Sequence, residues 1–116
     1  MKNMKNSILG LTNDLNFYFY SKPVNMAKGI EGLKGLVIND LGMDPMNGDV
    51  FIFCSGNHKQ VKLLYYNDNA YTLYTRRVYK GFFIYPNYKA ETDSYTIDWQ
   101  RLRRMLTGFV YRKVMY

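Results

Sequence analysis

The stretch that decides the fold runs from Gln60 to Pro86 and reads QVKLLYYNDNAYTLYTRRVYKGFFIYP. It holds three runs rich in β-branched and aromatic residues, which favour strands: Val61 to Tyr66, Ala70 to Tyr79 and Phe82 to Tyr85. The turn Asn67-Asp68-Asn69 consists of short polar residues that tolerate positive φ, as a hairpin loop requires. The pattern therefore predicts a three-stranded antiparallel meander. Lys80-Gly81 makes its second turn, and Pro86, which lacks an amide hydrogen, ends it.

The middle run of this stretch is mixed in polarity on both faces. Strand alternation places Tyr71, Leu73, Thr75 and Arg77 on one face, and Thr72, Tyr74, Arg76 and Val78 on the other. We therefore predict an antiparallel sheet with one covered side and one side that presents Tyr and Arg to a polar partner.

Two further strands and a helix are predicted before this stretch. Residues 15–20, LNFYFY, alternate as a strand with Leu15, Phe17 and Phe19 on one face. Asn25 is a suitable N-cap for a helix from Met26 to about Leu41, which has apolar residues at i+3 and i+4 spacing. The run from Val50 to Cys54 is apolar on both faces, which is typical of a central strand.

The C-terminal part predicts one short strand and a second helix. Tyr95 to Ile97 is extended, and Asp98 then caps a helix from Trp99 to Thr107 whose apolar stripe is Trp99, Leu102, Leu106 and Phe109. We expect Trp99 to be substantially buried between this helix and the sheet.

The predicted fold class is α+β: an antiparallel meander sheet with one helix after the first strand and a C-terminal helix. We expect residues 1–14 to form a loosely ordered lead-in, residues 15–109 a single α+β domain, and residues 110–116 a basic tail. A chain of 116 residues suits one core of modest size.

Composition narrows the functional classes. The 16 Lys and Arg against 9 Asp and Glu give a net charge of +7, which favours a polyanionic or acidic partner without choosing among DNA, RNA and protein. One Cys and one His cannot form a disulfide or the usual four-ligand zinc site, so a cytoplasmic location is expected. The apolar part of the N-terminal segment is too short for a signal peptide, and no apolar run is long enough to span a membrane.

The sequence gives no pattern typical of catalysis. Cys54 and His58 are four residues apart, but alternation points Cys54 into the core, where a thiol is inert. The aspartates fall mostly in predicted turns and caps, where they have local structural roles, and no phosphate-loop glycine pattern is present. We therefore expect no enzymatic activity, no catalytic residue, no metal, no cofactor, no small-molecule substrate and no membrane partner.

Basic residues interleaved with tyrosines are the strongest functional signal. Arginine contacts phosphate, and tyrosine stacks on bases or bonds to phosphate oxygens. For Arg77 two roles stay open, that of a binding residue and that of an anchor for a buried acid. The candidate binding residues are Lys28, Lys62, Tyr74, Arg76, Arg77, Lys80, Tyr85, Arg101, Arg103, Arg104, Arg112 and Lys113.

The chain resembles the small accessory proteins, called TnpB or second-frame proteins, of the IS66 family of bacterial insertion sequences. The resemblance covers residues 16–108, and in the opening stretch it rests on Leu64, Tyr65, Arg77, Gly81, Phe83 and Pro86. Upstream it rests on Asn25-Met26-Ala27-Lys28, Gly32-Leu33, and Leu41-Gly42-Met43-Asp44-Pro45 with Gly48, Phe51 and Phe53. The chain departs from the family pattern at Ala27, where arginine is usual, at Tyr66 and Tyr85, which replace tryptophans, and at Asn67, which replaces an aspartate.

The resemblance implies a role as an accessory factor in transposition, beside a separately encoded transposase that carries out strand transfer. Three hypotheses follow for the chain itself. It binds DNA through its Arg and Tyr surface, or it is an adaptor that binds the transposase, or it is a small nuclease. The absence of a convergent group of acids in the sequence disfavours the nuclease.

Overall fold

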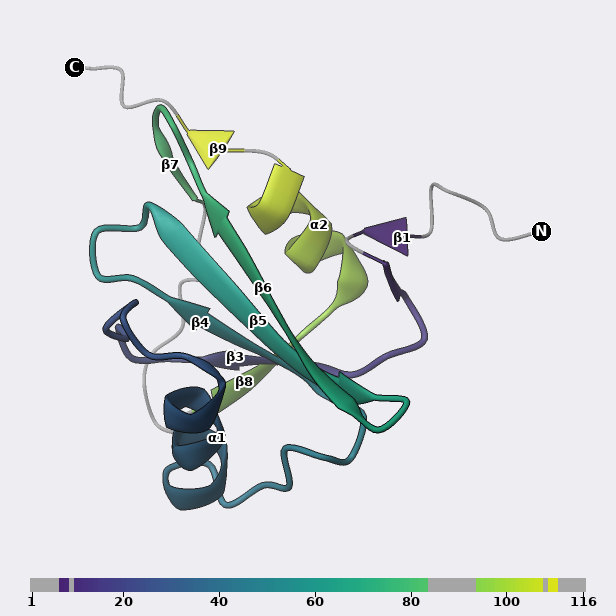
Figure 1. Cartoon of the computed structure of the whole chain (residues 1–116). Helices are drawn as coiled ribbons and strands as arrows, with labels where there is room; N and C mark the ends of the chain where they lie inside the picture. Colours follow the sequence, from purple (N-terminus) through teal and green to yellow (C-terminus); the bar gives the residue numbers. More distant parts are fainter. Residues whose placement is uncertain (1–6, 9, 84–93, 108, 111–116) are drawn as a thin grey trace.

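A computed structural model describes residues 7–8, 10–83, 94–107 and 109–110, and a five-stranded sheet forms its centre (Figure 1). The strands of this sheet are β3 (Phe17–Tyr20), β4 (Val50–Cys54), β5 (Gln60–Asn67), β6 (Ala70–Arg77) and β8 (Ser94–Ile97). The helices are α1 (Ile30–Asn39) and α2 (Trp99–Thr107). Two short antiparallel pairs complete the elements: β1 (Ser7–Ile8) with β2 (Leu11–Thr12), and β7 (Phe82–Phe83) with β9 (Phe109–Val110).

The strand order across the sheet is β6-β5-β4-β3-β8. β4, β5 and β6 form an antiparallel meander, and β8 is antiparallel to β3. β3 and β4 are parallel, because the chain leaves β3, crosses one face as α1 and returns to start β4 at the same end. The α+β class is confirmed, with one parallel pair in an otherwise antiparallel sheet.

Helices cover both faces of the sheet, and each face has its own core. All five residues of β4 are buried, as predicted for a central strand. Val50, Ile52 and Cys54 face the core beneath α2, whereas Phe51 and Phe53 face the core beneath α1. Helices pack on both sides of the sheet, whereas the sequence predicted one covered side and one side that presents Tyr and Arg to a partner.

The turn between β5 and β6 has the predicted conformation. Its two central residues, Asp68 and Asn69, have φ of 51° and 63°. Positive φ at both central positions is characteristic of a type I′ hairpin, whose twist matches that of the flanking strands.

The predicted pairing of the third meander strand with β6 is wrong. Gly81, with φ of 82°, turns the chain away from β6, and β7 pairs with β9 instead. The strand that completes the meander is β4, which pairs with β5. Tyr85 and Pro86 lie outside the described residues.

Helix α1 begins four residues later than predicted. Asn25 caps a local turn, since its side-chain oxygen accepts from the Ala27 amide at 2.8 Å. Lys62 Nζ reaches across from β5 and donates to the carbonyl oxygens of Met26 and Lys28, each at 2.8 Å. Those carbonyls would accept intrahelical hydrogen bonds in a longer helix, so Lys62 holds residues 26–28 out of it.

Helix α2 has the predicted bounds and cap. The Asp98 carboxylate accepts from the Arg101 amide at 2.8 Å, and Leu102, Met105 and Leu106 are buried against the sheet. Trp99 is only half-buried, with its ring 5.6 Å from that of Phe17, because it lies at the first position of the helix. Met105 occupies a core position that the predicted stripe left out.

The N-terminal lead-in contributes to the core. β1 and β2 form an antiparallel pair, and Leu11 of β2 is 1% exposed within the core on the α2 side. The sequence did not predict this contact, because residues 7–12 are too few to show a periodic pattern.

Candidate nucleic-acid interface

Among the residues that the structure describes, charges separate to opposite ends of the five-stranded sheet. The register aligns the start of β3 at Phe17 with the start of β4 and the end of β8. Four aspartates lie just beyond the strands at this end, which we call the acidic end: Asp14, Asp49, Asp68 and Asp98. Five cations lie beyond or at the opposite strand ends, which we call the basic end: Lys22, Lys59, Arg76, Arg77 and Lys80.

The acidic end affects a neighbouring phenol. Burial raises the pKa of Tyr65, and the negative charges of Asp68 and Asp14 raise it further. Two of the four carboxylates therefore act on one side chain, although they are distant in the sequence. The strand register brings these aspartates to the same end of the sheet, and their charges make the electrostatic potential there negative.

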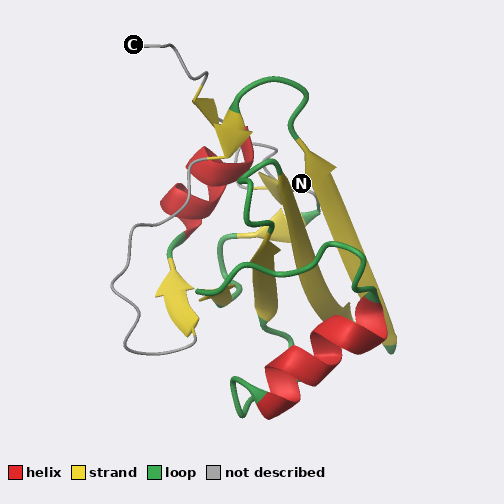
Figure 2. Ribbon diagram, turned by 90° about the vertical axis from the view of Figure 1, so that its left-hand side faces the viewer, coloured by secondary structure: helices red, strands yellow, loops and turns green. Residues whose placement is uncertain are grey.

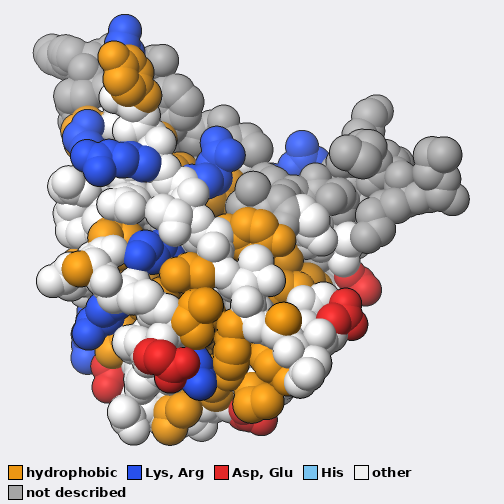
Figure 3. All heavy atoms as spheres, in the orientation of Figure 1, with side chains coloured by type: hydrophobic (Ala, Val, Ile, Leu, Met, Phe, Trp, Pro, Cys, Tyr) orange, Lys and Arg blue, Asp and Glu red, His pale blue; other side chains and the backbone are white. Residues whose placement is uncertain are grey.

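The space-filling view shows the same separation on the β6 side of the molecule. In Figure 3 a group of Lys and Arg side chains lies in the upper half with no Asp or Glu beside it, while other Lys and Arg side chains lie in the lower half. The Asp and Glu side chains on this face lie in the lower half. The molecule therefore presents a cationic surface at one end of its strands.

The loop between β4 and β5 gives the basic end a fixed backbone. Ser55 Oγ accepts from the amides of Lys59 and Gln60, at 3.3 and 3.0 Å. The carbonyl of His58, a residue with φ of 61°, accepts from the Phe83 amide at 2.8 Å. The β4–β5 loop is thereby tied to β7.

Lys59 links this loop to the β6–β7 turn. Its Nζ donates to the Gly81 carbonyl at 3.2 Å and lies 4.5 Å from the centre of the Phe82 ring. Lys59 and Arg77 also line one open pocket of about 370 Å³, together with the amide side chains of Asn57 and Gln60. The residues that line this pocket thus include two cationic and two amide types, which are hydrogen-bond donors suited to anionic oxygens.

The structure brings together only part of the predicted site. Arg76, Arg77 and Lys80 are exposed at the basic end. The exposure of Arg77 favours a surface role over that of an anchor for a buried acid. Tyr74 is half-buried and packs against the core on the α2 side. Tyr85, Arg112 and Lys113 lie outside the described residues.

Lys62 is a structural residue and not part of the surface. Its side chain is buried, with 8% of the residue exposed, and its two hydrogen bonds go to backbone carbonyls of residues 26 and 28. Lys28 itself is exposed and precedes α1, and its carbonyl lies 2.8 Å from Lys62 Nζ.

The arginines of α2 form a second exposed group. Arg101 lies near the acidic end, with Nε 3.9 Å from the Asp98 carboxylate. Arg103 and Arg104 are exposed further along the helix, and Arg104 lies in its last turn.

Lys22 and Lys59 belong to the basic end but were not among the predicted residues. Each is a single lysine in a turn, where it forms no cluster in the sequence. Only the pairing of β3 with β4 and of β5 with β6 brings these turns to the same end of the sheet.

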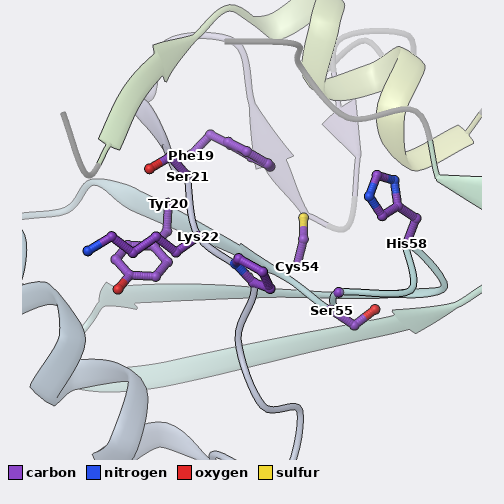
Figure 4. Close-up of a pocket in the computed structure, with 9 residues that line it drawn as sticks. Phe19, Tyr20, Ser21, Lys22, Cys54, Ser55 and His58 are labelled. Atoms are coloured by element: carbon purple, nitrogen blue, oxygen red, sulfur yellow. The ribbon is translucent and has the colours of Figure 1, made fainter. Parts of the chain in front are cut away.

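Cys54 and His58 line a small pocket on the other side of the β4–β5 loop (Figure 4). The pocket has a volume of about 200 Å³ and also contains Ser21 and Lys22. Cys54 is 3% exposed and packs in the core on the α2 side, as its place in the strand predicted. In Figure 4 Lys22 extends away from the side of the pocket on which His58 lies.

The acids of the described residues are engaged in local structure. Asp98 caps α2, Asp49 accepts from the Asn16 side chain at 3.3 Å, and Asp14 accepts from the Thr12 hydroxyl. Within the described ranges, no group of three or more His, Cys, Asp or Glu side chains is arranged to hold a metal ion. No helix in the described part of the chain is long and apolar enough to cross a membrane.

Comparison with known proteins gives two matches. The sequence pattern of a family described as IS66 Orf2-like protein matches residues 15–115. An uncharacterized protein of Sinorhizobium fredii, y4jC, is 26% identical to the chain in a match that covers 84% of this chain and 92% of that protein. No solved structure matches the chain.

Proposed function

Because the chain belongs to the family of IS66 Orf2-like proteins, we propose that it serves transposition as a non-catalytic factor that binds DNA through the basic end of its sheet. The observation that carries this proposal is the separation of five cations from four aspartates along the strands. Such a separation steers a polyanion to one end of the molecule and repels it from the other.

The contacts of this surface would be with the DNA backbone. Duplex DNA carries one negative charge per about 1.7 Å of its axis, so a surface with several cations meets several phosphates at once. The pocket between Lys59 and Arg77 supports a phosphate oxygen as the anchored group, since Asn57 and Gln60 add neutral donors there. Contacts of this kind fix position and carry no sequence information.

Binding should depend on the basic end and on salt. We expect the triple variant Arg76→Gln, Arg77→Gln, Lys80→Gln to bind duplex DNA roughly 100-fold more weakly near 0.15 M salt. The slope of log K against log salt should become shallower by about 2.7, since each phosphate contact contributes about 0.9. Fluorescence anisotropy with terminal inverted-repeat DNA and with random duplex, titrated at several salt concentrations, measures both quantities.

A matched variant separates the two groups of arginines. Arg101→Gln, Arg103→Gln, Arg104→Gln removes the same charge from α2, where Gln is a good helix former, and it should weaken binding much less. Equal losses in both variants would contradict an interface confined to the basic end, because the arginines of α2 would then contribute as much. If both variants keep the wild-type salt slope but the first loses association with the transposase, the adaptor hypothesis replaces DNA binding.

The protein should not cut DNA. Supercoiled plasmid incubated with the purified protein and Mg²⁺ or Mn²⁺ should remain supercoiled on an agarose gel, because the aspartates at the acidic end are separate caps and turn residues. Cleavage that is lost on mutating one of these aspartates would contradict the non-catalytic role.

A further inference from the structure

Strand β6 forms an open edge of the five-stranded sheet. It is eight residues long and pairs with β5 on one side only. Figure 2 shows it at the right-hand edge of the sheet, with no described element beyond it. Its first six residues, Ala70 to Thr75, contain no charge, proline or glycine. Natural sheets cover or blunt such an edge, because its unpaired amides and carbonyls bind other strands.

The backbone groups that β6 leaves unpaired can be assigned by position. The Val78 amide donates to the Lys59 carbonyl at 2.9 Å, so position 78 points toward β5. Asn67 and Ala70 close the two-residue hairpin, so position 70 points the same way. Because these directions alternate along an antiparallel strand, Tyr71, Leu73, Thr75 and Arg77 direct their backbone groups outward.

We infer that the β6 edge pairs with the β6 edge of a second copy of this chain, antiparallel about a two-fold axis at Leu73. Opposite residues must share a face and must both direct their backbone groups outward. A register centred on Leu73 meets both conditions, because it places Leu73 opposite its own copy and Tyr71 opposite Thr75. The combined sheet would have ten strands.

The edge is complementary to itself in charge. Antiparallel pairing places the start of one β6, which follows Asp68, beside the end of the other, which carries Arg76 and Arg77. In this register Ala70 lies directly opposite Arg76 of the second copy. The end of β6 therefore meets the acidic end of the second copy, and this favours a second copy over a strand of unrelated charge.

The edge is also complementary in its apolar side chains. Tyr71 and Leu73 are half-buried and pack against the core on the α1 side. The two-fold axis would bring both Leu73 side chains together and cover the parts of both residues that the monomer leaves exposed. Thr72 and Tyr74 would pair in the same way on the α2 side.

Disulfide formation tests the register. The two Leu73 Cα atoms would lie about 5.5 Å apart, within the range of a disulfide, whereas the two Thr75 Cα atoms would lie roughly 14 Å apart. Under mild oxidation we expect Leu73→Cys to give a covalent dimer on non-reducing gels and Thr75→Cys to remain uncrosslinked. Cys54 is buried and present in both variants.

A pair of substitutions at one exposed position tests the charge complementarity. Ala70→Glu would face Arg76 of the second copy favourably, and Ala70→Arg would face it unfavourably. We expect the dimer of the Arg variant to have a Kd about tenfold higher than that of the Glu variant, counting two symmetric contacts. Sedimentation velocity across a concentration series measures the Kd values, with circular dichroism as the control for folding.

Three results would overturn the inference. They are a wild-type chain that stays monomeric across the series, equal crosslinking of the two Cys variants, and dimers of the two Ala70 variants with equal Kd. The last two would show that any dimer forms through another surface.

Discussion

Replacing Lys62 with Met is expected to lower the free energy of unfolding by about 3 kcal/mol, because two carbonyls lose a charged donor at once. Met retains most of the apolar stem of lysine, so the change removes the ammonium group and little packing. The carbonyls of Met26 and Lys28, each 2.8 Å from Nζ, would lose the donor that holds residues 26–28 against β5. Urea denaturation of the two proteins measures the difference.

Lys28→Met is the matched control for this prediction. It removes the same charge from an exposed side chain and should change stability by no more than about 0.5 kcal/mol. A loss below about 1 kcal/mol for Lys62→Met would show that water replaces the ammonium group, and Lys62 would no longer be a structural anchor.

Replacing Phe53 with Ala is expected to cost about 4 kcal/mol. Phe53 is 0% exposed in the central strand, and its ring lies 5.6 Å from that of Tyr20. The Tyr20 hydroxyl donates to Asp40 at 2.7 Å, next to the end of α1. The cavity would therefore weaken the packing of α1 as well as that of β4. In denaturant unfolding monitored by circular dichroism, we expect the helix and sheet signals to be lost in a single transition.

Phe53→Leu separates the volume of the side chain from its hydrophobicity. It keeps an apolar group in the core and should cost about 1 kcal/mol. If Phe53→Ala and Phe53→Leu have the same small effect, the core beneath α1 can collapse around the missing ring, and the packing of α1 does not depend on this position.

Local patterns predicted the elements of the fold well, and long-range pairing less well. β4 and α2 have the predicted bounds, because an apolar run and an Asp cap are local signals. The start of α1 was wrong because its determinant, Lys62, lies in another strand. The pairing of β7 with β9 was missed for the same reason, since neither strand carries a signal for its partner.

In the candidate site, too, the residues that are close in sequence were predicted, and those brought together by long-range pairing were not. Arg76, Arg77 and Lys80 are near one another in the sequence, and they remain together at the basic end. Lys22 and Lys59 join them only because β3 pairs with β4 and β5 pairs with β6, which brings distant turns to the same end of the sheet. Lys62 was included among the candidates because charge alone does not reveal that its strand position points under α1.

The position of β8 beside β3 has a consequence for synthesis of the chain on the ribosome. The meander of β4, β5 and β6 pairs residues that are close in sequence and can close once residue 77 has emerged. β3 has to wait for Ser94–Ile97, which most of the chain separates from it. A nascent chain therefore exposes two open strands, β3 and β6, and premature termination before Ser94 leaves both permanently available for association with other chains.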